Sequence, residues 1–335
     1  MYEYFLGFGI ILLLLYWFSK GFKSVEKSDI HNKHVLITGG SSGIGKSVAI
    51  EAAKLGAHVT IVARNSEKLE LAVNEIKNVM NTSFQKVNKI SLDVSKSYQS
   101  VQDAINSVEE TIGPIFLLVN CAGMAVCGKI EDSTETDYRS MIEVNYYGTV
   151  FPTLAVAKKM MSRSKGHIVI TGSQGSLIGI YGMSAYCSSK FALRGFAESL
   201  FMELSPYNIS VTLCLPPDTN TPGFENEEKS KPVITRLISK TAGLFEPDVV
   251  AKQLISDALN QRFFSVVGFE STILTTLCSG MSPVKPVIDG IFQILFMSLL
   301  KLVSVGYFFY FKKLILNHVK PFKPDPNEPT LNKNK

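Results

Sequence analysis

HVLITGGSSGIGK, residues 34–46, is the stretch that decides the fold of this chain. Its apolar run, residues 35–37, has the composition of a buried parallel strand. Three glycines follow the run at fixed spacing, Gly39, Gly43 and Gly45, and apolar residues then recur at helical spacing up to Leu55. A strand, a glycine-rich turn and a helix place backbone N–H groups where a diphosphate binds. Glycine is needed because a Cβ would block the cofactor, or the contact of helix with strand.

Composition narrows the class of protein. Of the 335 residues, 46% are hydrophobic, and the mean hydropathy is +0.17. Both values are high for a wholly soluble protein, and the excess of hydrophobic residues lies at the two ends of the chain. The net charge is +5, and basic residues stand beside the apolar segments, so a membrane flank is favoured over a nucleic-acid partner. The five cysteines lack metal-ligand spacing, which indicates reduced structural thiols and no metal site.

Apolar runs and helical patterns alternate from His34 onward. This alternation predicts an α/β domain over residues 30–269, a Rossmann-type, doubly wound parallel sheet with helices on both faces. Strands are expected at residues 35–37, 58–62, 89–92, 115–119, 167–171, 210–215 and 263–267. Helices are expected at residues 44–55, 66–79, 98–112, 136–161, 186–204 and 247–259. Residues 216–246 are polar and rich in Pro and Asn, and a loop of that length inside a domain is typical of a functional lid.

Both ends of the chain suggest membrane contact. Residues 1–20 contain the run FLGFGIILLLLYWF, which approaches the ~20 residues that span a bilayer and is interpreted as an uncleaved anchor. Lys20, Lys23 and Lys27 follow it, and a basic flank is retained in the cytosol.

Residues 271–311 form a second apolar region, broken by Pro283 and Pro286. An aromatic cluster, residues 307–311, and a basic tail over residues 312–335 follow, which favours a membrane hairpin with a cytosolic tail or a helix in the membrane plane. The alternative is a helix packed on the domain or on a second copy of the chain.

Tyr186 and Lys190 lie four residues apart in the sequence YCSSK. On a helix they share one face. A free phenol titrates near pH ~10, and an ammonium group beside it lowers that pKa, at ~1.4 kcal/mol for each pKa unit. The pair therefore predicts a proton shuttle.

Three further features appear in order with this pair: Ser173 after an apolar strand, the turn Asn120-Cys121-Ala122-Gly123, and Asn145. Together with the glycine-rich turn they resemble the short-chain dehydrogenase/reductase family over about residues 33–269. The resemblance implies that Ser173 binds the substrate oxygen, Tyr186 is the acid/base, and Lys190 also holds the nicotinamide ribose. Asn145 would support a proton-relay water. Cys121 stands where the family usually has a second Asn.

Cofactor choice follows from the end of the second strand. NAD binding favours a carboxylate there, whereas this chain has Arg64, with Ser41 in the turn and Lys68 one helical turn on. Cations suit a 2′-phosphate, so NADPH is expected, the alternative being a solvated basic cluster. Asp93 resembles the family's adenine contact. The expected cofactor-binding residues are Gly39, Ser41, Ser42, Gly43, Gly45, Arg64, Lys68, Asp93, Asn120, Tyr186 and Lys190.

A narrower resemblance concerns the substrate. PPDTNTPG (residues 216–223), SSKFALRG (residues 188–195) and the apolar ends are similar to the 3-ketodihydrosphingosine reductases, a group within that family. This implies NADPH-dependent reduction of a long-chain 3-keto amine lipid. The alternatives are a membrane-bound retinol or hydroxysteroid dehydrogenase, and a non-catalytic NADP-binding scaffold.

Location and assembly are the remaining expectations. We expect an enzyme of the endoplasmic reticulum membrane whose catalytic domain faces the cytosol. We also expect a homo-oligomer. The sequons at Asn81 and Asn208 leave the orientation open, because a lumenal domain would be able to use them.

Overall fold

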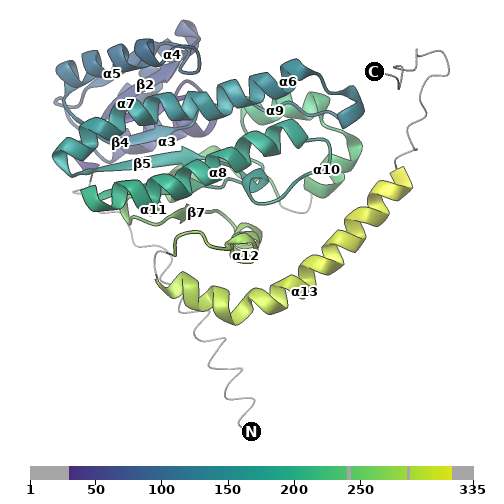
Figure 1. The fold of residues 1–335 in the computed structure, drawn as a ribbon. Helices are drawn as coiled ribbons and strands as arrows, with labels where there is room; N and C mark the ends of the chain where they lie inside the picture. The colour runs from purple at the N-terminus through teal and green to yellow at the C-terminus, as the bar shows by residue number, and fades with distance from the viewer. Residues whose placement is uncertain (1–29, 240–242, 285–286, 319–335) are drawn as a thin grey trace, which may run out of the picture.

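The computed structural model describes residues 30–239, 243–284 and 287–318, and its centre is one parallel sheet (Figure 1). Seven strands hydrogen-bond in the order β3-β2-β1-β4-β5-β6-β7. They are β1 His34–Thr38, β2 His58–Ala63, β3 Val87–Ser91, β4 Ile115–Asn120, β5 Gly166–Thr171, β6 Ile209–Cys214 and β7 Phe264–Ser265. The doubly wound α/β fold is thereby confirmed, although β7 is shorter than the sequence predicts.

Helices cover both faces of the sheet (Figure 1). The main ones are α3 Gly43–Lys54, α4 Ser66–Lys77, α5 Tyr98–Ile112, α7 Gly148–Arg163, α8 Ser184–Leu204 and α11 Pro247–Leu259. Successive strand residues point to opposite faces. Leu36 therefore joins a core with α5, α7 and α8, whereas Val35 and Ile37 join a second core with α3, α4 and α11. These two apolar layers explain why the central strands are continuous hydrophobic runs.

The helix expected over residues 136–161 is interrupted. It consists of α6 Glu135–Met141, a π-helical turn η2 Ile142–Tyr147, and then α7. Such π turns inside helices are frequent at functional sites. Asn145 lies within this one.

The segment 216–246, called the lid segment below, is more ordered than the loop that its composition suggests. It contains two helices, α9 Pro222–Ser230 and α10 Val233–Ser239. Its two ends pair, because Asn220 N donates to Phe245 O (2.8 Å) and Phe245 N donates to Asp218 O (2.9 Å). The lid segment therefore leaves and re-enters the domain through a narrow neck.

Two helices follow the sheet domain, α12 Phe269–Cys278 and α13 Val287–His318. Helix α13 contacts α12 and α10, and its far end extends away from the sheet (Figure 1). Residues Asp289–His318 of α13 are long and apolar enough to cross a membrane, with a mean hydropathy of 1.8. Lys312 and Lys313 lie inside α13, so the boundary expected at residue 312 falls within a helix. The predicted anchor, residues 1–20, lies outside the described residues.

Candidate active site

The glycine-rich turn is packed against the turn that follows β4. Gly39 has φ +66°, and a Cβ on it would lie 2.8 Å from backbone atoms of Cys121 and Ala122. A Cβ on Gly45 would lie 2.4 Å from Gly39 O, so helix and strand approach as closely as the sequence predicts. Ser42, the N-cap of α3, makes no side-chain capping bond. The first turn of α3 is therefore a cradle for an anion such as a diphosphate.

Asn120 closes this side of the site at the end of β4. Its Nδ2 donates to Thr153 Oγ1 (3.1 Å) and to Val169 O (3.2 Å). Its Oδ1 is buried, with no hydrogen-bond partner among the described residues. Buried acceptors are rarely left unpaired, so this atom suits a donor from a bound group. The glycine cradle and this oxygen fit a nicotinamide dinucleotide.

The expected adenosine end of the site pairs Arg64 with Asp93. Arg64 Nη1 lies 3.9 Å from Asp93 Oδ2, and Asp93 Oδ1 accepts from Ser95 N (3.0 Å) and Ser95 Oγ (2.7 Å). Partial burial opposes ionisation of Asp93, but these hydrogen bonds and the Arg64 charge hold its pKa below the usual value. Lys68 is exposed on the first turn of α4. Within the described residues, the side chains of Lys68 and Ser41 make no ion pair or hydrogen bond with this pair.

Ser173, Tyr186 and Lys190 come together beside the carboxyl end of β5. Tyr186 and Lys190 lie on α8, with Lys190 Nζ 5.7 Å from the centroid of the tyrosine ring. The Ser173 side chain lies close enough to the Tyr186 hydroxyl to lower the pKa of the phenol. Lys190 is buried and donates to Thr171 O at 2.9 Å. A carbonyl oxygen that meets both hydroxyls would have two hydrogen-bond donors.

The pKa values in this group differ from the expectation that Lys190 lowers the pKa of Tyr186. Burial raises the pKa of Tyr186 above its ordinary value, and the neighbouring Ser173 side chain offsets only part of the rise. Burial also lowers the pKa of Lys190 to about 8. Lys190 does not lower the pKa of Tyr186 below its ordinary value, because the ammonium group is directed at the Thr171 carbonyl. The desolvation of the buried phenol outweighs the effect of the lysine charge. The phenol is therefore protonated at neutral pH and able to act as an acid.

Asn145 positions the surrounding chain. Its Oδ1 accepts from Met124 N (2.8 Å), and its Nδ2 donates to Met124 O (3.0 Å) and Ser189 Oγ (2.9 Å). A Cβ on Gly123 would lie 3.2 Å from Asn145 Oδ1 and 3.7 Å from Lys190 Nζ, so this glycine lies between the two side chains. The amide thus ties the turn after β4 to α8, and the relay water expected at Asn145 stays a prediction.

Sequence reasoning did not single out several residues at this site. The Thr171 carbonyl holds Lys190, and the Thr221 side chain faces Gly43, where a Cβ would lie 3.1 Å from its methyl carbon. Thr221 caps α9 by accepting from Phe224 N (3.1 Å), and Pro222 follows it. Threonine followed by proline is a recognised helix-start signal, which would have revealed α9. No local signal marks a carbonyl that acts as an acceptor.

Comparisons with known proteins agree with this geometry. The family model described as short chain dehydrogenase matches residues 33–232. A 3-ketodihydrosphingosine reductase from Bos taurus is 43% identical over 304 residues, 91% of each chain. A 3-dehydrosphinganine reductase from Danio rerio is 44% identical over 304 residues, again 91% of each chain. The crystal structure of levodione reductase superimposes with a TM-score of 0.64 and 25% identity, covering 71% of this chain and 96% of that one.

Proposed function

Because this chain belongs to the short chain dehydrogenase family, we propose that it reduces 3-ketodihydrosphingosine to dihydrosphingosine with NADPH, a step of sphingolipid synthesis. The substrate rests on the relatives, several of which are reductases of this lipid and match nearly the whole chain. The observation that carries the chemistry is the convergence of Ser173, Tyr186 and Lys190 beside the end of β5, with the phenol held in its protonated form. Reduction of a ketone requires an acid at this place.

The residues of the chain perform three tasks in this reaction. Ser173 and Tyr186 bind the carbonyl oxygen, and Tyr186 gives its proton to the oxygen as negative charge develops there. Lys190 places a positive charge beside the phenol and stabilises the phenolate that forms. The glycine cradle and Asn120 would hold the nicotinamide cofactor, which would supply the hydride.

NADPH is the finer assignment, and Arg64 supports it. Arg64 directly follows β2, where an NAD enzyme favours a carboxylate. A guanidinium group binds a phosphate through two parallel hydrogen bonds. Lys68 on the first turn of α4 adds a second cation nearby in the chain.

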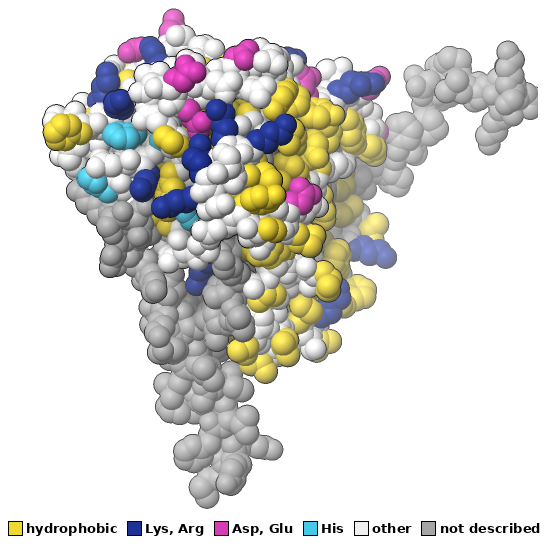
Figure 2. All heavy atoms as spheres, turned by 60° about the vertical axis from the view of Figure 1, so that its left-hand side comes forward, with side chains coloured by type: hydrophobic (Ala, Val, Ile, Leu, Met, Phe, Trp, Pro, Cys, Tyr) yellow, Lys and Arg dark blue, Asp and Glu magenta, His cyan; other side chains and the backbone are white. Residues whose placement is uncertain are grey.

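We place the enzyme in the endoplasmic reticulum membrane with its domain in the cytosol. Helix α13 supports membrane association. Figure 2 shows Lys and Arg side chains gathered on one face of the molecule. Two of the basic residues, Lys33 and Lys165, lie 6.0 and 5.8 Å from the centroid of the Phe116 ring. Basic side chains suit the anionic cytosolic leaflet. Leu154 and Phe191, exposed on α7 and α8, are apolar surface that suits a homo-oligomer.

A substrate panel tests this function. The full chain in purified membranes receives NADPH and, separately, 3-ketodihydrosphingosine, retinal or a ketosteroid. We expect turnover of the keto amine, and a fall of about 10²- to 10⁴-fold in Tyr186→Phe with NADPH binding retained. Preference for retinal or the steroid would assign a different dehydrogenase. Absence of turnover with every ketone would leave a non-catalytic NADP-binding scaffold.

A further inference from the structure

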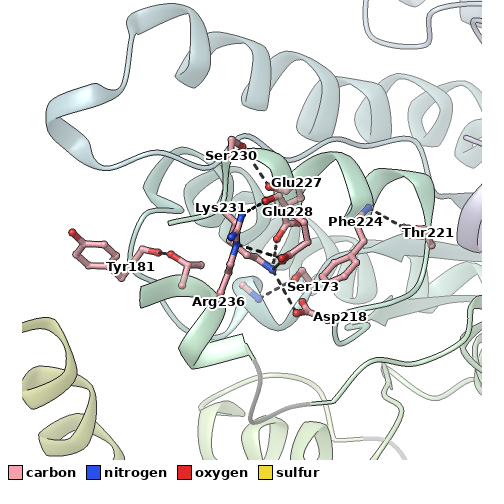
Figure 3. A network of polar contacts seen from close by, with 12 residues as sticks. Ser173, Tyr181, Asp218, Thr221, Phe224, Glu227, Glu228, Ser230, Lys231 and Arg236 are labelled. Atoms are coloured by element: carbon pink, nitrogen blue, oxygen red, sulfur yellow. Dashed lines mark hydrogen bonds and ion pairs between the residues drawn. The ribbon is translucent and has the colours of Figure 1, made fainter. Parts of the chain in front are cut away.

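The lid segment holds a buried ammonium group in a cage of carboxylates (Figure 3). The side chain of Lys231, at the end of α9, is 0% exposed. Its Nζ lies 2.8 Å from Glu228 Oε1, 2.9 Å from Glu227 Oε1 and 3.5 Å from Asp218 Oδ2. The centroid of the Phe224 ring lies 4.7 Å from the same nitrogen. Carboxylates and an aromatic face together are a setting that recognises primary ammonium groups.

Among the described residues, the carboxylates of this cage outnumber the cations. Three carboxylates face Lys231, and Arg236 Nε lies 3.5 Å from Glu228 Oε2. Asp218 and Glu227 therefore share the single ammonium of Lys231. Burial raises the pKa of both carboxyl groups despite this shared partner. A second cation would stabilise their ionised forms.

The neck of the lid segment adjoins the loop of the catalytic serine, because Gln174 N donates to Pro216 O (3.4 Å), two residues before Asp218. The charges of Glu227 and Asp218 both disfavour ionisation of Tyr186, and Glu227 also raises the pKa of the next residue, Cys187. Helix α10 fixes the lid segment to the loop before α8, because Thr235 Oγ1 donates to Tyr181 O at 2.6 Å. Figure 3 shows Ser173 among the residues drawn around the cluster. The cage is thus held beside the hydroxyls that meet the ketone.

The substrate chemistry supplies a further cation. In 3-ketodihydrosphingosine the amine is attached to the carbon next to the ketone and is protonated at neutral pH. When Ser173 and Tyr186 hold the ketone oxygen, this ammonium group lies in the immediate surroundings of the phenol. Glu227 and Asp218, which share Lys231, are carboxylates of the lid segment whose charges act on this phenol.

We propose that Glu227 and Asp218 bind the ammonium group of the substrate and select amino ketones over neutral ketones, an inference that rests on the proposed function. Lys231, over the ring of Phe224, holds the two carboxylates in place before the substrate arrives. The lid segment therefore selects the substrate in addition to covering the site.

Two substrates and four variants test the proposal. The full chain is assayed with 3-ketodihydrosphingosine and with the same ketone lacking the amine, for the native sequence, Glu227→Gln and Asp218→Asn. Glu225→Gln removes a charge from the exposed side of the same helix and is the matched control. Glu228→Gln removes a carboxylate that pairs with both Lys231 and Arg236. The effect of this variant measures how far the cage acts only by stabilising the fold of the lid segment.

We expect Glu227→Gln and Asp218→Asn to lose on the order of ten- to a hundredfold in kcat/KM for the amino ketone, mainly through KM. The value for the neutral ketone should stay within about twofold, as should both values in the Glu225→Gln control. Equal losses for both ketones, or equal losses in Glu228→Gln, would overturn the inference and leave the reductase assignment intact. If the native chain reduces neither ketone, the proposed function itself fails.

Discussion

At the scale of single residues, burial controls the protonation of Tyr186. The ammonium group of Lys190 is directed at the Thr171 carbonyl and lies 5.7 Å from the centroid of the Tyr186 ring. Desolvation raises the pKa of the phenol and lowers the pKa of the lysine to about 8. A protonated phenol suits reduction, because the acid is already loaded when the ketone binds.

Arg64 carries the prediction on cofactor choice. Replacing it with Asp should reduce kcat/KM for NADPH at least about tenfold relative to NADH, because a carboxylate repels the 2′-phosphate and accepts from a ribose hydroxyl. Lys77→Asp makes the same charge change at the exposed far end of α4 and is the control. An unchanged ratio of the two kcat/KM values in Arg64→Asp would remove the case for NADPH specificity.

Some residues of the site were predictable from the sequence and others were not. Ser173, Tyr186 and Lys190 were predictable because each follows a strand end or shares a helix face, and the structure places them together. The Asp218–Lys231 pair was not predictable. Its members come from the neck and from the end of α9, and their contact depends on how the lid segment folds back.

At the scale of elements, strands were easier to predict than interruptions. Each central strand is an apolar run with a core on both faces, and so its signal is local. The π turn around Asn145 left no such signal, because it depends on contacts with Met124 and Ser189 from elsewhere in the chain. Helices α9 and α10 were missed because a polar composition is shared by loops and exposed helices.

His34 at the start of β1 gives the element-scale prediction. Its Nδ1 donates to Gly113 O (2.7 Å), which leaves Nε2 to accept from Thr60 Oγ1 (2.9 Å). Burial lowers its pKa from 6.5 to about 4. Between pH 6.5 and about 4, this histidine is protonated in the unfolded chain but neutral in the folded chain. The stability that this residue contributes is therefore complete above pH 6.5 and is lost as the pH falls toward 4.

Denaturant unfolding at several pH values, with native chain and His34→Gln compared, measures this contribution. The difference in unfolding free energy should shrink by on the order of 2 kcal/mol between pH 7 and pH 4.5. The difference is the useful quantity, because Asp257, whose pKa burial raises to about 6, gains stability as the pH falls through the same range. A difference that does not vary with pH would mean that His34 is not buried in its neutral form.

At the scale of the whole molecule, the sheet domain suits an aqueous surrounding, whereas α13 suits an apolar one. The domain buries its apolar side chains in two cores, whereas α13 exposes Ile294, Leu302 and Phe308. Such a surface is stable when a lipid phase covers it. The domain would then work at the bilayer surface, where a long-chain ketone resides.

Orientation is the prediction at this scale. Protease added to sealed microsomes should digest the domain, because the basic flank of the predicted anchor keeps the domain in the cytosol. Glycosidase should leave the mobility of the chain unchanged, even though Asn81 and Asn208 are both exposed. Full protection from protease together with a glycan on Asn81 would reverse the orientation.

The central claim is that this chain transfers a hydride from NADPH to the carbonyl carbon of a membrane lipid while Tyr186 supplies the proton. Mass spectrometry of the product made with NADPH that carries deuterium at both hydrogen positions of the nicotinamide C4 tests it most directly. We predict dihydrosphingosine with a single deuterium on C3 from the native chain, and at most a trace of product from Tyr186→Phe. Product without deuterium, or equal yields from the two chains, would contradict the account.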